Sequence, residues 1–162
     1  MFGFLKSPPL SPRLHRLKTS ALFGSLTPLE LKIVDGLMHE RRYLSDEIVF
    51  DEGEEGQALY LIMAGRVAIR RAGAGAAGGA ERVAELSPGS IFGDLALLDD
   101  TPRTAQARAL DNCELAVFFR ADFMNLMETD AVIGYKIALS LARLMGQRLR
   151  AWMAGSAPTE AL

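Results

Sequence analysis

The sequence predicts a mainly β fold with flanking α-helices, built as an antiparallel barrel or sandwich. From residue 43 to residue 115, short runs rich in Val, Ile, Phe and Tyr are separated by Gly, Asp and Pro, a pattern typical of strands joined by tight turns. No helix-length segment separates successive runs, which disfavours a parallel Rossmann sheet. Helical periodicity precedes and follows this region, so we expect helices to flank the strands.

Length and composition fit one compact domain. The chain has 162 residues, enough for a single hydrophobic core. Hydrophobic residues make up 49% and charged residues 23%, which disfavours intrinsic disorder and fibrous repeats. The formal net charge is -2, which disfavours a dedicated nucleic-acid binder. Any anionic ligand therefore has to be bound by local groups.

The expected compartment is the cytoplasm. Cys113 is the only cysteine, so we expect no internal disulfide and no cysteine-based zinc site, which fits a reducing environment. Pro8 and Pro9 interrupt the apolar start, and no cleavage site of a signal peptide follows. No apolar run reaches the roughly 18 residues that a membrane span needs. We expect neither secretion nor an integral membrane segment.

Three parts follow one another along the chain. Residues 1–20 carry several basic groups, no acid and three prolines, and are expected to form a solvated arm that passes into a short basic helix. A basic arm that touches a partner or an anionic membrane is the less favoured alternative. Residues 21–154 form the domain, with the barrel over about 43–119 and C-terminal helices over about 120–153. Residues 155–162 are expected to be a disordered tail.

A capping box marks the first helix of the domain, expected over 25–41. Thr27 precedes Pro28, and Glu30 stands three places after Thr27. The predicted apolar stripe of this helix consists of Leu29, Ile33 and Leu37. The predicted strands cover 48–50, 58–64, 66–70, 82–86, 105–109 and 113–119, and the Gly and Ala segment 72–80 is expected to be a hairpin loop.

Helical periodicity returns after the last strand, over 122–127 and 130–153. One face of the longer helix carries Ile133, Ile137, Leu141, Leu144 and Arg148. Ala138, Met145 and Trp152 recur at intervals of seven beside that face. A helix that is apolar on more than one side usually covers two partners, so we expect it to pack on the barrel and on a second copy of the chain.

Residues 91–105 interrupt the strands with a predicted anion site. Gly93 lets the backbone approach a ligand without a Cβ, and the short helix after it offers unpaired N–H groups of Leu95 and Ala96. Arg103 supplies a planar guanidinium whose geometry matches phosphate oxygens. Asp94 would repel a phosphate but can accept a hydrogen bond from a ligand hydroxyl. Both charges together fit a ribose phosphate.

This stretch resembles the phosphate-binding cassette of the cyclic nucleotide-binding domain family, shared by bacterial catabolite activator proteins, cyclic-nucleotide-dependent kinases and gated channels. The family pattern is F-G-E-L-A-L, a short spacer, then P-R-x-A. The matching positions are Phe92, Gly93, Leu95, Ala96, Leu97, Pro102, Arg103 and Ala105. Residues 51–67 also resemble the family's glycine-punctuated strands, and the resemblance covers about 22–153.

The resemblance implies an eight-stranded jelly-roll-like β-barrel that binds a cyclic mononucleotide. Arg103 would take the cyclic phosphate, and Asp94, one methylene shorter than the usual Glu, would hold the ribose 2′-hydroxyl. The predicted ligand-binding residues are Phe92, Gly93, Asp94, Leu95, Ala96, Arg103, Thr104 and Ala105. Thr104 could meet a guanine amino group, which keeps cGMP close behind, but cAMP is favoured because it is the commoner messenger. The last helix would cap the base through Arg143, Leu144, Gln147 or Arg148.

No catalytic activity, metal or cofactor is expected. Neither Ser-His-Asp nor paired-carboxylate spacing is present, and His15 and His39 have no second ligand nearby. Transcription factors of the family follow the long helix with a helix-turn-helix unit, whereas nine residues follow Met153 here, so DNA binding is not expected. The sequence therefore predicts a stand-alone sensor that signals to an unidentified partner protein.

Two other functions stay open. One is a cyclic di-GMP receptor that uses the same pocket and binds a second phosphate through Arg70, Arg71 or Arg108. The other is a ligand-free barrel that serves as a dimerisation module through its long helix. In that case the buried charge of Arg103 would be paired with Asp99, Asp100 or Asp111.

Overall fold

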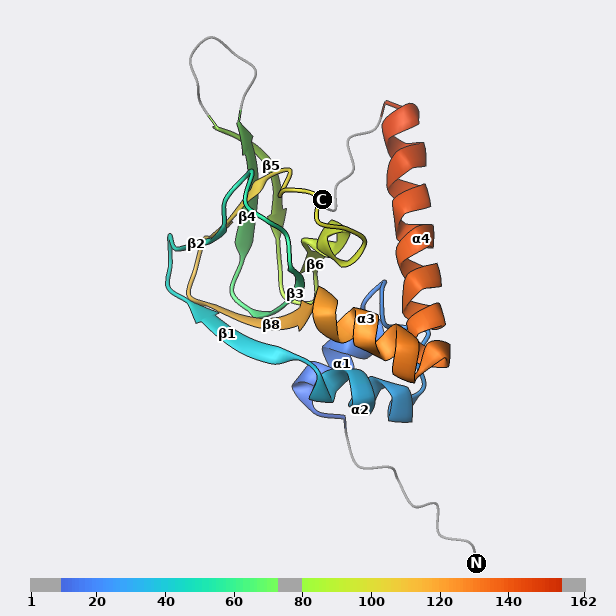
Figure 1. Cartoon of the computed structure of the whole chain (residues 1–162). Helices are drawn as coiled ribbons and strands as arrows, with labels where there is room; N and C mark the ends of the chain where they lie inside the picture. Colours follow the sequence, from blue (N-terminus) through green and yellow to red (C-terminus); the bar gives the residue numbers. More distant parts are fainter. Residues whose placement is uncertain (1–9, 73–79, 156–162) are drawn as a thin grey trace, which may run out of the picture.

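The computed structural model describes residues 10–72 and 80–155. Eight strands form two four-stranded antiparallel sheets, and helices gather at one end and along one side of them (Figure 1). One sheet has the order β1-β8-β3-β6 and the other the order β2-β7-β4-β5. The mainly β fold with flanking helices is confirmed.

The elements follow a simple order along the chain. The strands are β1 (His39–Tyr43), β2 (Ile48–Phe50), β3 (Ala58–Ala64), β4 (Val67–Ala72), β5 (Ala80–Leu86), β6 (Ile91–Phe92), β7 (Gln106–Ala109) and β8 (Cys113–Phe119). The helices are α1 (Pro12–Thr19), α2 (Pro28–Gly36), the short 3₁₀ helix η1 (Asp94–Leu97), α3 (Arg120–Thr129) and α4 (Ala131–Met153). The predicted segments 66–70, 82–86 and 105–109 thus differ from the observed strands by one or two residues at an end.

Two apolar clusters hold these elements together. The first lies between the sheets and includes the stacked rings of Tyr60 and Phe92, whose centroids are 5.1 Å apart. The second lies between the helices and the outer side of β3 and β8, around Phe23 and Phe118. Side chains alternate across a strand, so β3 and β8 serve both clusters. Apolar residues of α1 to α4 cover the second cluster, and this fixes the helices against the barrel.

The N-terminal part of the domain differs from the prediction. The helix expected over 25–41 ends at Gly36, and the segment His39–Tyr43 is strand β1. Leu29 and Ile33 of the predicted stripe are exposed, while Leu31 and Val34 are buried. Most side chains of β1 are exposed, so the segment lacks the apolar alternation that identifies a strand. Pairing with β8 makes it a strand.

The predicted capping box is confirmed and also anchors α4. Thr27 Oγ1 accepts from the Glu30 N–H, and the Glu30 carboxylate accepts from the Thr27 N–H. The same carboxylate accepts from Lys136 Nζ at 2.8 Å on each oxygen. Hydrogen bonding to Lys136, then to the Thr27 backbone, lowers the pKa of Glu30. One carboxylate therefore fixes the start of α2 to the first turns of α4.

The β4–β5 pair contains the predicted hairpin. Val67 pairs with Leu86 and Ala72 with Ala80, with a bulge between Ile69 and Arg70. The predicted Gly and Ala loop over 72–80 lies mostly outside the described residues, as do the first residues of the arm and most of the predicted tail.

Cys113 is the first residue of β8, and its side chain is buried against the neighbouring turns. Its Sγ is within hydrogen-bonding distance of the carbonyl oxygens of Arg66 (3.2 Å) and Asp111 (3.3 Å). Burial raises the pKa of this thiol. Gly65, at φ +80°, packs on it so closely that an added Cβ would lie 2.7 Å from the sulfur. A side chain at position 65 would not fit.

The described residues include neither a membrane-spanning helix nor a metal-binding group of side chains. In residues 10–72 and 80–155, no helix combines the length and apolarity needed to cross a bilayer. Within the same ranges, no three His, Cys, Asp or Glu side chains form a group that could hold a metal ion.

The packing of α3 on α4 generates a stability prediction. A Cβ at Gly134 would lie 2.8 Å from the Met127 Cα, so Gly134→Ala should lower the free energy of unfolding by about 1–3 kcal/mol. Gly146→Ala on the same helix meets the flexible Arg150 guanidinium at 3.3 Å and should raise stability by up to about 1 kcal/mol. Thermal unfolding followed by circular dichroism compares the two, and an unchanged midpoint for Gly134→Ala would contradict the close packing.

Candidate functional site

The candidate site begins where β6 ends. Gly93 has φ +71° and caps the 3₁₀ helix η1, a conformation that favours glycine. A Cβ at this position would lie 2.7 Å from Arg103 Nη1. Glycine is therefore required twice here, once for the turn into η1 and once for the close approach of the arginine.

The backbone of Arg103 is held on both sides by the loop before β3. The Arg103 N–H donates to the Glu54 carbonyl at 2.7 Å, and the Gly53 N–H donates to the Arg103 carbonyl at 2.8 Å. Pro102 forms an isolated bridge with Glu55 next to these bonds. The glycine-punctuated segment noted in the sequence thus positions the backbone of Arg103.

Arg103 is a buried residue, 9% exposed, and its guanidinium lies inside the barrel wall. It donates to the carbonyl oxygens of Gly93 (3.1 Å) and Ala58 (2.7 Å), and its Cζ lies 4.0 Å from the centroid of the Phe50 ring. Its Nε is buried and has no hydrogen-bond partner. Burial is the main cause that lowers the pKa of this guanidinium, and Tyr60 opposes it. An arginine so placed remains charged at neutral pH.

Within the described ranges, no carboxylate forms an ion pair with Arg103. Asp99 accepts from the Thr101 N–H at 3.0 Å, Asp100 pairs with Arg120, and Asp111 pairs with Arg66. The competing prediction, in which one of these three acids neutralises Arg103, is therefore wrong.

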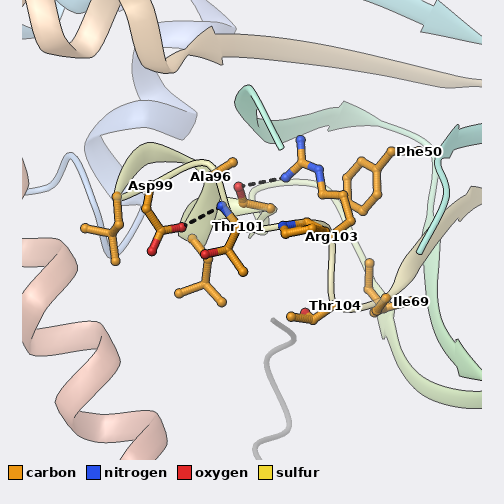
Figure 2. A pocket seen from close by; sticks show the side chains of 12 residues that line it. Phe50, Ile69, Ala96, Asp99, Thr101, Arg103 and Thr104 are labelled. Carbon is orange, nitrogen blue, oxygen red and sulfur yellow. Dashed lines mark hydrogen bonds between the residues drawn. The ribbon is translucent and has the colours of Figure 1, made fainter. Parts of the chain in front are cut away.

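A cavity of about 120 Å³ opens beside the guanidinium (Figure 2). Figure 2 shows Arg103 beside Phe50, with Thr104 next to Ile69 and with Ala96, Thr101 and Asp99 on the opposite wall. Six of the eight predicted ligand-binding residues line this cavity: Gly93, Leu95, Ala96, Arg103, Thr104 and Ala105. Phe92 and Asp94 do not line it, and both are fully buried.

Asp94 was expected beside the pocket as an acceptor for a ligand hydroxyl, but it is buried and does not line the cavity. Its Oδ1 accepts from Arg148 Nη1 of α4 at 3.0 Å, and its Oδ2 is buried without a hydrogen-bond partner. The Arg148 side chain is 13% exposed, and its Nε is also buried and unpartnered. The sequence predicted that Arg148 lies on the same face of the last helix as Ile133 and Ile137. It did not predict the pairing of Arg148 with Asp94.

One expected donor is already engaged. The Ala96 N–H, predicted to be unpaired, donates to the Gly93 carbonyl at 3.3 Å and closes the turn of η1. The prediction assumed an α-helical start, in which the first amides are unpaired, whereas a 3₁₀ turn uses the amide one residue earlier.

Sequence reasoning did not single out Arg120, the first residue of α3. Its Nη1 is within hydrogen-bonding distance of the carbonyl oxygens of Gly56, Ala96 and Asp99. No periodicity or motif predicts this contact, because it depends on where α3 begins relative to η1.

Comparison with known proteins decides the family. The profile of the cyclic nucleotide-binding domain matches residues 40–130. The chain belongs to the cyclic nucleotide-binding domain family. In this cyclic nucleotide-binding domain, Gly93 and Arg103 both fall inside the matched range.

This cyclic nucleotide-binding domain is similar to several named proteins and solved structures. It is 37% identical over 128 residues to the cyclic AMP receptor protein of Thermus thermophilus, across 78% of this chain and 58% of the relative. The crystal structure of the Thermus thermophilus catabolite activator protein superposes with a TM-score of 0.76 at 34% identity, across 84% of this chain and 61% of that one. The regulatory domain of Toxoplasma gondii PKA with cAMP gives 0.65 at 29% identity, across 70% and 42%. The chain thus spans about three fifths of the Thermus protein.

The Asp94–Arg148 pair generates a second prediction. Arg148→Met leaves the Asp94 carboxylate buried and unpaired, so it should lower the free energy of unfolding by about 3 kcal/mol or more. Asp94→Asn combined with Arg148→Met should cost less than the sum of the two single changes. Chemical denaturation of the four proteins measures the coupling. Arg150→Met, at an exposed position of the same helix, serves as the control and should stay within about 0.5 kcal/mol. Additive effects would contradict the pairing.

Proposed function

We propose that the protein is a sensor that binds a cyclic mononucleotide in the cavity beside Arg103 and signals to a partner protein without catalysing a reaction. The observation that carries this proposal is the buried guanidinium of Arg103, which faces a cavity and has no carboxylate in ion-pair contact within the described ranges. A buried charge without a counter-ion is costly. A cyclic phosphate would supply the missing anion, and the free Nε would give it a further donor.

Asp94 supports the ribose part of the proposal. Its Oδ2 is a buried acceptor without a donor, and a carboxylate oxygen in that state gains from a hydroxyl hydrogen bond. Asp94 is fully buried and does not line the cavity, so a ribose hydroxyl reaches Oδ2 only when η1 shifts toward the ligand, while Oδ1 can stay with Arg148. The shorter side chain, compared with glutamate, makes a water-bridged contact the alternative geometry.

The favoured nucleotide is cAMP. The relatives named above are a cyclic AMP receptor protein and a regulatory domain solved with cAMP. Thr104 is exposed and lines the cavity, which keeps cGMP as the next candidate because its hydroxyl could meet a guanine amino group. None of Arg70, Arg71 and Arg108 lines this cavity, which gives no support to a second phosphate at these residues.

The proposed signal leaves the pocket through α4. Asp94 borders the cassette and pairs with Arg148, and Trp152 lies one helical turn beyond Arg148 with its side chain exposed. A nucleotide that changes the Asp94 hydrogen bonds would therefore shift the end of α4, which a partner protein could read. We place this exchange in the cytoplasm, which the buried thiol of Cys113 fits.

Calorimetric titration with cAMP, cGMP and cyclic di-GMP tests the proposal. We expect cAMP to bind, and we expect Arg103→Ala to weaken that binding by at least about a hundredfold because the phosphate loses its buried charge partner. Arg103→Lys keeps the charge but loses the planar fork, so its affinity should lie between the two.

Arg66→Ala is the matched control, since Arg66 pairs with Asp111 and Glu85 and does not line the cavity. Circular dichroism verifies that each variant is folded. Binding of cyclic di-GMP alone would replace the mononucleotide assignment. Wild-type affinity in Arg103→Ala would refute the site, and an unchanged thermal midpoint with all three nucleotides would favour a ligand-free assembly module.

We further propose a parallel dimer through α4. The exposed side of α4 carries apolar and small residues at alternating intervals of three and four: Val132, Tyr135, Leu139, Ala142, Gly146, Leu149 and Met153. This is the spacing of a coiled-coil seam. The predicted partner face at Ala138 and Met145 is different, because these two residues pack against the helical core.

The dimer predicts a clear effect of charge on that seam. Leu149 is 56% exposed in the single chain, and Leu149→Asp would place two like charges opposite each other in the dimer. We expect sedimentation equilibrium to show a dimer for the wild type and a monomer for Leu149→Asp. Gln147→Asp, two residues away and off the seam, should remain dimeric. A wild type that is monomeric at all concentrations would exclude the dimer.

A further inference from the structure

Arg120 contacts three separate parts of the chain from the first position of α3. Its Nη1 lies 3.1 Å from the Gly56 carbonyl oxygen, 3.2 Å from that of Ala96, and within hydrogen-bonding distance of that of Asp99. Its Nη2 pairs with the Asp100 carboxylate. The side chain is 18% exposed, so most of it is removed from solvent. One guanidinium therefore contacts the 91–105 segment at Ala96, Asp99 and Asp100.

The segment that Arg120 holds is a wall of the pocket. Ala96 and Asp99 both line the cavity beside Arg103 (Figure 2). Gly56 lies directly behind that wall, because a Cβ on it would be 3.0 Å from the Ala96 Cβ and 3.5 Å from Arg103 Nε. The Arg120 contacts thus reach the backbone of this wall and of the loop directly behind it.

Arg120 also begins the helix that supports α4. Its own N–H donates to the Gln57 carbonyl at 2.8 Å, which fixes the first turn of α3 to the start of β3. α3 packs tightly on α4 at Met127 and Gly134. A shift of the wall would therefore be transmitted to α3 and, through the packing of α3, to α4.

We propose that Arg120 is a positioning residue that fixes the Ala96–Asp99 wall of the pocket and makes the first turn of α3 follow that wall when the pocket is occupied. This inference rests on the proposed function, since it assigns the residue that couples the same pocket to the helices. It differs from the Asp94–Arg148 contact, which connects the other end of the cassette to α4. The fork of the arginine is needed because a lysine has no second planar donor group for Asp100 once its amine is on the carbonyls.

The first test uses the protein without nucleotide. Amide hydrogen exchange followed by mass spectrometry compares the wild type with Arg120→Gln and with the control Arg66→Gln. Arg66 is also held by two acids, but it lies next to the start of β8, whereas Arg120 follows the end of that strand. We expect faster exchange over residues 94–102 in Arg120→Gln and no change there in Arg66→Gln. Unchanged exchange in Arg120→Gln would overturn the proposal.

The second test adds cAMP as the probe. In the wild type, saturation with cAMP should alter exchange over 120–129, and this change should be lost in Arg120→Gln while Arg66→Gln retains it. The affinity of Arg120→Gln for cAMP should fall by about tenfold, as expected for lost charge-assisted hydrogen bonds behind the site. A ligand-dependent change in α3 that persists in Arg120→Gln would refute the coupling.

A conservative variant separates charge from geometry. Arg120→Lys keeps a positive charge near Asp100 but cannot reproduce the forked contacts, so it should resemble Arg120→Gln in both exchange measurements. Wild-type behaviour of Arg120→Lys would overturn the requirement for the fork. If the wild type binds no cAMP in calorimetry, the proposed function fails, and the nucleotide-free comparison still decides whether Arg120 fixes the wall.

Discussion

The guanidinium of Arg103 is charged, buried and hydrogen-bonded to the neutral carbonyl oxygens of Gly93 and Ala58. Carbonyl dipoles and the face of Phe50 offset part of the cost of burying this charge, but they do not neutralise it. Asp94 is the corresponding buried acid, and it pairs with Arg148 rather than with Arg103. The positive group beside the cavity and the buried negative group therefore have separate partners.

The long helix α4 has two differently anchored halves. Ile133, Ile137 and Leu141 are buried in the helical core, and the Lys136–Glu30 pair fixes the same half to α2. Beyond Leu141 most side chains are exposed, and Arg148 makes the main polar contact with the cassette. Segments with few buried apolar contacts open more readily than the rest of a fold. The half of α4 nearest the pocket is thus held mainly by one polar pair rather than by buried apolar contacts.

The sequence predicts those parts of the site whose geometry is local. Gly93 and Arg103 are ten residues apart and meet because a short turn brings them together, so a contiguous motif identifies them. Arg148 is 54 residues from Asp94, and Arg120 is 24 residues from Ala96; these contacts depend on how helices pack on the barrel. Strand β1 was missed for a related reason, because its exposed side chains carry no apolar alternation and its strand conformation comes from pairing with β8. Long-range packing, rather than local propensity, fixes these elements.

Cys113 has a practical consequence for work on this domain. The thiol is the only one in the chain, it is 2% exposed, and burial raises its pKa, so little thiolate is available to react at neutral pH. Gly65 packs against it and closes the approach from the adjacent turn. A cysteine introduced on the surface would therefore be alkylated well before the natural one. The unmodified chain can serve as a background for spin labels or fluorophores on α3 and α4, with no need to replace Cys113 and disturb the start of β8.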